Sequence, residues 1–169
     1  ARALGLIFGN PSALDALRKT LVSKSVNITE RRKALKILVE KQAPGLAPSL
    51  QELLKEKELR AEALRGLAAY DDPGTPGVIL KLYPNLSESE KAFATNTLAS
   101  RKNYAIALLR ALSGGQLNRK DISVPIARQI QSLGDKDLSA LLKKHWGEIR
   151  PIAADKVKRI KEYKGFLTK

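Results

Sequence analysis

The sequence predicts an all-α protein in which antiparallel helix hairpins stack into an α-α superhelix. Apolar residues recur at the three- and four-residue spacing of helices along nearly the whole chain, and no stretch alternates as a half-buried strand does. The expected connections are short, about two to eight residues, which favours antiparallel neighbours. Successive helix pairs also resemble one another, and units that cannot bury their own apolar face stack into a solenoid.

The first three helices are located by residues typical of helix starts. Asn10 precedes Pro11, as an N-cap precedes proline at the first helical position. Thr29 is expected to cap the second helix, and Pro48 to open the third. Their apolar residues are Leu14, Leu17, Leu21 and Val22 in the first, Ala34, Leu35, Ile37 and Leu38 in the second, and Leu50, Leu53 and Leu54 in the third.

Capping signals also locate the following helices. A fourth helix is expected over 58–70, and Thr75 with Pro76 repeats the cap-then-proline pattern for a short fifth helix. Ser87 and Glu90 have the spacing of a capping box, in which each side chain bonds the backbone N–H of the other. Further helices are expected near 103–113, 123–133, 136–146 and 152–167, separated by glycines and Pro151.

An alanine followed four residues later by a leucine recurs in the second, fourth and sixth expected helices. The alanine allows close approach of a neighbouring helix, and the leucine fills the layer between hairpins. This spacing predicts that these helices are buried between layers. The pairs are Ala34–Leu38, Ala63–Leu67 and Ala94–Leu98, and Ala127 begins a poorer fourth copy.

Two groups of residues resemble known proteins. Residues 50–67 (LQELLKEKELRAEALRGL) resemble a HEAT repeat, with a Leu-x-x-Leu-Leu helix, a short turn and an Ala-x-x-x-Leu helix. Residues 132–135 (SLGD), 146–150 (WGEIR) and 161–167 (KEYKGFL) are together similar to a region of large modular bacterial proteins described as membrane-bound dehydrogenases. Those proteins join a sugar-dehydrogenase-like propeller to HEAT repeats and then to a c-type haem domain.

The resemblance implies one HEAT/armadillo-like domain over residues 1–169, acting as a connector within an exported, periplasmic redox protein. It places haem c in an adjoining domain, since this chain contains no Cys and therefore no Cys-x-x-Cys-His. No cofactor is expected in the chain itself. The sequence has no Met and begins with Ala1-Arg2-Ala3, so we expect a piece excised from a larger multidomain protein. No apolar run approaches the ~20 residues of a membrane span, so we expect a soluble fragment that does not insert into a membrane.

Composition excludes several kinds of chemistry. Without Cys there is no disulfide, thiolate metal site or Cys nucleophile. His145 is the only histidine, which excludes a pair of His metal ligands, and with Trp146 near a helix end it is typical of a structural role. Two acidic pairs are explained as loop or helix-start residues, namely Asp71–Asp72 and Asp135–Asp137. We therefore expect no catalytic residue and no enzyme.

Basic residues supply the remaining candidates, because 31 Lys and Arg stand against 17 Asp and Glu, a net charge of +14. We expect a non-catalytic scaffold that positions neighbouring domains or binds a protein partner. The alternative is a basic HEAT-like nucleic-acid-binding domain that contacts phosphates, although only 5% of the residues are aromatic and able to stack on bases. The candidate interaction surface consists of Arg31, Arg32, Lys36, Trp146, Lys156 and Arg159.

Overall fold

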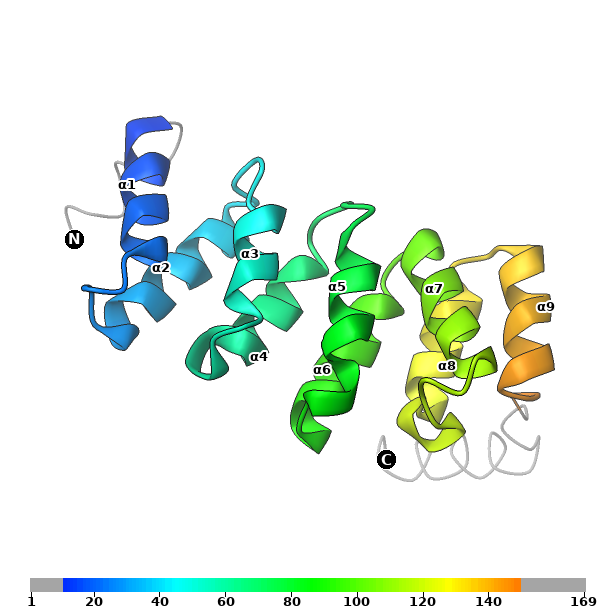
Figure 1. The fold of residues 1–169 in the computed structure, drawn as a ribbon. Coiled ribbons are helices and arrows are strands. Elements are labelled where there is room, and N and C mark those ends of the chain that lie inside the picture. Colours follow the sequence, from blue (N-terminus) through cyan, green and yellow to red (C-terminus); the bar gives the residue numbers. More distant parts are fainter. Residues whose placement is uncertain (1–10, 150–169) are drawn as a thin grey trace, which may run out of the picture.

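The all-α prediction is confirmed by the computed structural model, which describes residues 11–149 (Figure 1). Within this range the chain forms nine α-helices and two short 3-10 helices, and no strand. The α-helices are α1 (Pro11–Val22), α2 (Ile28–Glu40), α3 (Ala47–Leu53), α4 (Lys57–Leu67), α5 (Thr75–Leu82), α6 (Glu88–Leu98), α7 (Lys102–Ser113), α8 (Val124–Ser132) and α9 (Lys136–His145). The 3-10 helices are η1 (Tyr83–Asn85) and η2 (Arg119–Asp121).

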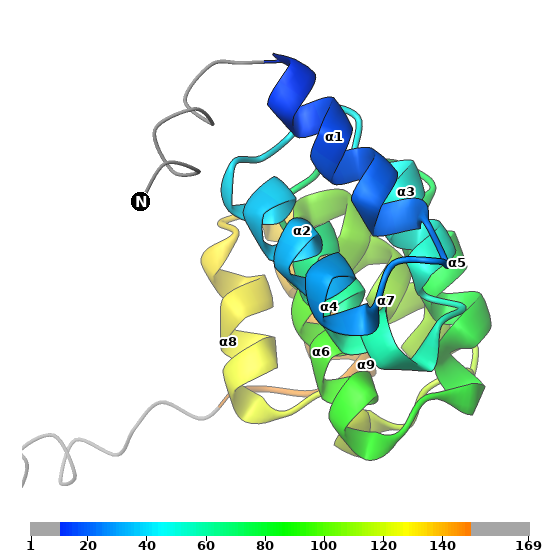
Figure 2. The ribbon, with the colours of Figure 1, turned by 90° about the vertical axis from the view of Figure 1, so that its left-hand side faces the viewer.

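The helices pack in two rows along one direction. In one row α2 packs against α4 and α4 against α6, while in the other α3 packs against α5, α5 against α7 and α7 against α9. Contacts of α1 with α2, α3 with α4 and α8 with α9 join the rows. Figure 2, seen from the α1 end, shows α2, α4 and α6 behind one another. These contacts stack consecutive helix pairs, as the sequence predicts.

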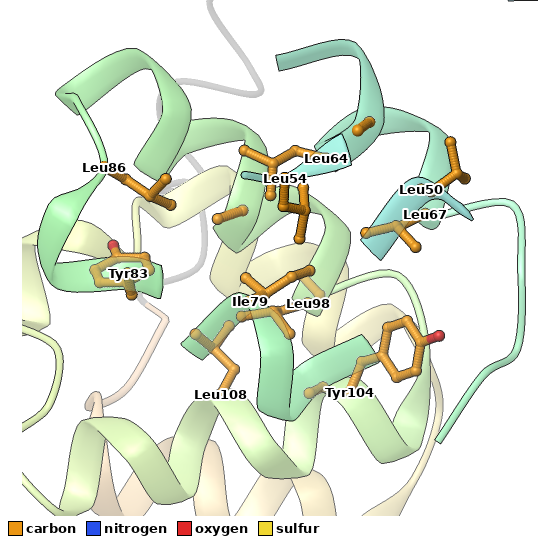
Figure 3. Packing of buried hydrophobic residues seen from close by; sticks show 14 of the residues in the cluster. Leu50, Leu54, Leu64, Leu67, Ile79, Tyr83, Leu86, Leu98, Tyr104 and Leu108 are labelled. Atoms are coloured by element: carbon orange, nitrogen blue, oxygen red, sulfur yellow. The ribbon is translucent and has the colours of Figure 1, made fainter. Parts of the chain in front are cut away.

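The alanine–leucine pairs of α2, α4 and α6 are buried as predicted, with at most 2% of any of these six residues exposed. Ala127 of α8 is buried as well. The core continues into the second row, where Figure 3 shows Ile79, Leu98 and Leu108, from three different helices, packed together. Successive pairs therefore share one continuous apolar core.

Two helix starts differ from the prediction. Thr29 does not cap α2, because Asn27 is the N-cap and its side chain accepts the N–H of Glu30 at 3.0 Å. Thr75 is the first residue of α5 rather than its cap. The Asp72 carboxylate accepts the N–H groups of Gly74 and Thr75 at 3.0 and 3.1 Å. Asn and Asp accept backbone N–H groups two or three residues ahead, so they satisfy the first N–H groups of helices that begin earlier than the Thr signals indicate.

Other local predictions are confirmed or corrected. Ser87 and Glu90 form the capping box of α6, and Asp135 caps α9 by accepting the N–H of Leu138 at 2.8 Å. The fourth helix ends at Leu67, after which three N–H groups bond to carbonyls three residues back in a tightened last turn. Val22, one of the apolar residues assigned to the first helix, has 57% of its surface exposed. The expected cap Asn10 and the expected helix at 152–167 lie outside the described residues.

Gly66 sets the distance between α2 and α4. A Cβ atom at Gly66 would lie 2.9 Å from Cγ2 of Val39 and 3.4 Å from Cδ1 of Leu50. Val39 is β-branched and has little rotamer freedom in a helix, so it cannot turn away from such an atom. The absence of a side chain at Gly66 therefore lets the two helices pack closely.

We expect Gly66→Ala to lower the free energy of unfolding. Overpacking costs about 1–3 kcal/mol, which exceeds the roughly 0.5–1 kcal/mol that alanine gains over glycine in a helix. Gly77→Ala is the matched control, because no atom lies within 4 Å of a Cβ there. It should raise the free energy of unfolding by about 0.5–1 kcal/mol. Urea unfolding followed by circular dichroism measures both, and equal changes in the two variants would contradict this role of Gly66.

Candidate protein-interaction surface

Of the six residues predicted to form an interaction surface, the structure describes four, and two of these four are buried. Arg31 and Trp146 are buried, with 6% and 7% of their surface exposed, so neither presents its side chain to a partner. Lys156 and Arg159 lie outside the described residues. Arg32 and Lys36 are exposed on α2 and remain candidates.

Arg31 is buried because it joins two helix ends. Its Nε donates to the carbonyl of Leu21 at 2.8 Å, at the end of α1. Its Nη2 and Nη1 lie 3.0 and 2.8 Å from the carboxylate oxygens of Glu56, which precedes α4. The hydrogen bond from Arg31 lowers the pKa of Glu56 from its usual value of 4.5, against the opposing effect of burial. Arg31, on α2, therefore holds the end of α1 and the start of α4 together.

Arg60 makes equivalent contacts 29 residues after Arg31. Its Nε donates to the carbonyl of Leu54 at 2.6 Å, and its Nη1 lies 3.3 Å from Oε1 of Glu90 in α6. Each of these two arginines stands three residues before the alanine of its helix. That shared register is the sequence signal that distinguishes Arg31 from the exposed cations beside it.

Trp146 directly follows α9 and packs inward. Its Nε1 donates to the carbonyl of Ile122 at 2.7 Å. The guanidinium of Arg119 lies 5.2 Å from the centre of the indole ring, and its Nε donates to the carbonyl of Trp146. The indole therefore fills the layer at this end of the described fold, which agrees with the structural interpretation of the His145–Trp146 dipeptide.

Arg32 and Lys36 line a groove of about 360 Å³ between α2 and α4. Leu35, Val39 and Gly66 provide its apolar part. Gly66 lies at the floor of the close approach between α2 and α4, where a Cβ atom would lie 2.9 Å from Cγ2 of Val39. We call this feature the α2–α4 groove.

Charged side chains surround the α2–α4 groove. Arg32 pairs with Glu62 at 2.8 Å and donates to the carbonyl of Glu58 at 2.6 Å, which ties α2 to α4. Among the described residues, Lys36 pairs only with Glu40, in a long and exposed contact of 3.8 Å. Exposed ion pairs of this kind contribute little to stability, so the Lys36 ammonium stays available to a ligand.

Arg65 lines the same groove from α4. Its guanidinium lies 4.7 Å from the centre of the Phe93 ring of α6, and within residues 11–149 it forms no ion pair. Neither the charge nor the position of Arg65 singled it out in the sequence, because no cluster of basic residues surrounds it. The groove thus offers apolar contact, hydrogen-bond donors and positive charge, which is the chemistry of binding.

Metal coordination and membrane spanning have no counterpart in residues 11–149. No group of three or more His, Asp or Glu side chains there is arranged to hold a metal ion. None of the helices in that range is both long and apolar enough to cross a bilayer. Comparison with protein-family models, with curated proteins and with solved structures found no match.

The pair between Arg31 and Glu56 predicts a dependence of stability on pH. Because the pKa of Glu56 is lowered from 4.5 in the folded protein, its contribution is present above pH 4.5 and is lost as the pH falls through the folded value. Glu56→Gln should cost about 1–2 kcal/mol at pH 7, since it weakens the pairing of a buried guanidinium. The difference in the free energy of unfolding between Glu56→Gln and the wild type should be smaller at pH 3 than at pH 7.

Urea unfolding at the two pH values measures this difference. Glu52→Gln is the matched control, because it removes only the exposed pair of Glu52 with Lys55. It should change stability little at either pH. Equal losses of the free energy of unfolding in Glu56→Gln and Glu52→Gln at pH 7 would show that the Arg31–Glu56 pair does not stabilise the fold.

Proposed function

We propose that this chain is a non-catalytic helical scaffold whose α2–α4 groove binds a protein partner or a neighbouring domain of a longer protein. The observation that carries this proposal is an apolar groove lined by the weakly paired Lys36 and by Arg65, which forms no ion pair within residues 11–149. The groove is set on two helices held by the Arg32–Glu62 pair. Grooves between packed helices bind partner segments through apolar anchors, and rim charges set their orientation.

The charges of the groove favour a protein over a nucleic acid. Glu40 and Glu62 line it together with the cations, and carboxylates repel a phosphate backbone. The net charge of +14 still favours a partner with an acidic surface, because it speeds the approach of anionic molecules. A partner with apolar residues flanked by acidic ones fits both features.

The same proposal includes the setting of an exported redox protein with an adjoining c-type haem domain. It is supported by the likeness of 132–135, 146–150 and 161–167 to dehydrogenases of that kind. In that setting the scaffold positions a haem domain relative to a dehydrogenase domain, and the chain itself holds no cofactor. A Cys-x-x-Cys-His motif encoded after Lys169 would support this setting, and a stop codon there would overturn it.

Photo-crosslinking tests the binding role. A photoreactive phenylalanine analogue at Val39 should capture a protein in cells that make the full-length parent of this chain, whereas the same analogue at Val78 should not. Val78 is the matched control because it is an exposed valine on α5, outside the groove. The captured protein is identified by mass spectrometry and purified, and Val39→Glu should weaken its binding at least tenfold.

Two results would overturn the proposed function. One is identical capture at Val39 and Val78, which would show that the groove is not a binding site. The other is a gel-mobility shift of duplex DNA or RNA at 50 mM salt that weakens steeply as salt increases, with affinity unchanged by Val39→Glu. Such a shift would assign the positive charge to phosphate contacts elsewhere on the chain.

A further inference from the structure

The α2–α4 groove carries one more positive charge than negative. Three cations and two carboxylates line it, namely Arg32, Lys36 and Arg65 with Glu40 and Glu62. Arg32 and Glu62 neutralise each other at 2.8 Å, and Lys36 lies 3.8 Å from Glu40. The remaining charge belongs to Arg65, which forms no ion pair in the described part of the chain. A ligand with a single negative charge would therefore neutralise the groove.

Two of these cations reach the groove from facing helices. Lys36 stands on α2 and Arg65 on α4, and both residues are exposed. A groove of about 440 Å³ between α5 and α7 is also lined by a cation, Arg110, but α5 contributes only Leu80 to it. A carboxylate would thus meet cations on both walls of the α2–α4 groove and on one wall of the other.

The floor below the two cations is apolar and of limited length. Leu35 and Val39 of α2 and Gly66 of α4 line it. The lining residues of α2 run from Arg32 to Glu40, about 12 Å at the helical rise of 1.5 Å per residue. An extended chain of single bonds advances about 1.2 Å per bond. About ten carbon atoms in a row therefore cover the length of the groove.

We infer that the α2–α4 groove binds a free medium-chain fatty acid, a monocarboxylate of about eight to ten carbons. Its carboxylate lies between Lys36 and Arg65, where charge-assisted hydrogen bonds are available. Its alkyl chain covers Leu35 and Val39. As regulation of the same site, the inference rests on the proposed function, because an alkyl chain on this floor displaces the apolar anchor of a protein partner.

The same geometry discriminates against related amphiphiles. An alkylammonium of equal length fits the floor but places a cation beside Lys36 and Arg65. A polyanion meets the carboxylates of Glu40 and Glu62, which repel its further charges. A chain much longer than ten carbons leaves its end in water, so the additional carbons gain no burial. We therefore expect a preference for one negative charge and for one range of chain length.

Isothermal titration calorimetry of sodium decanoate into the full 169-residue chain at pH 7.5 tests the inference. Binding should saturate at one decanoate per chain. Affinity should rise about two- to fourfold for each methylene added from hexanoate to decanoate, and level off beyond that length. Decyltrimethylammonium, the cationic probe of equal length, should not bind. Arg65→Ala and Lys36→Ala should each weaken decanoate binding about three- to tenfold.

Matched controls remove the same residue types from the other row of helices. Arg110→Ala removes the exposed arginine of the α5–α7 groove, and Lys81→Ala removes an exposed lysine of α5. Neither should change the affinity for decanoate. Val39→Glu places a carboxylate on the floor and should abolish binding. Circular dichroism of each variant verifies that the fold is kept, since none of the replaced side chains is fully buried.

Three outcomes would overturn the inference. One is the absence of saturable decanoate binding, and another is equally tight binding of decyltrimethylammonium. The third is an equal loss of affinity in Arg65→Ala and Arg110→Ala, which would assign the binding to the net charge of +14.

Failure of this inference and failure of the proposed function are distinguishable, because the titration uses the purified chain without a partner. Capture of a protein at Val39 but not at Val78, alongside any of the three outcomes, would leave the proposed function standing. Identical capture at Val39 and Val78 would overturn the proposed function, and saturable decanoate binding would still establish the fatty-acid site.

Discussion

Burial of a small and a large residue between successive helix pairs is the interaction on which this structure depends. No pair of helices covers its own apolar face, so α4 must lie against both α2 and α6. The alanines bring the backbones close, and the leucines fill the remaining space. The buried arginines Arg31 and Arg60 fix the orientation of neighbouring helix pairs, because each links the end of the preceding helix to a carboxylate of the next pair. Mutual burial and these links together determine how each pair sits on its neighbour.

The proposed binding face follows from this stacking. The residues two positions after the alanines of α2 and α4 are Lys36 and Arg65, and both line the α2–α4 groove. Gly66 lets α2 and α4 pack closely, and the guanidinium of Arg65 lies over the Phe93 ring of α6. The face is therefore a by-product of the packing rather than a separate structure. Changes in the core and changes in binding are for this reason expected to be linked.

The candidate site was only partly predictable from charge. Arg31 and Arg32 are adjacent and chemically alike, but neighbouring residues on a helix point about 100° apart. One is consequently buried and the other exposed. Arg65 stands outside the basic clusters, so an argument from those clusters passes over it. Register within the repeating pairs, rather than composition, separates the buried Arg31 and Arg60 from the exposed cations.

The sequence alone determined that the chain is helical, where the capping box of α6 lies, and which alanines and leucines are buried. These features depend on neighbours three or four residues away, so local patterns predict them. The tertiary structure decided the rest. It buried the guanidinium of Arg31 against Glu56, 25 residues further along the chain. It also buried Trp146, whose Nε1 donates to the carbonyl of Ile122. The reason is that the hydrogen-bond partners of these buried side chains lie 20 to 30 residues away in the sequence, beyond the reach of local patterns.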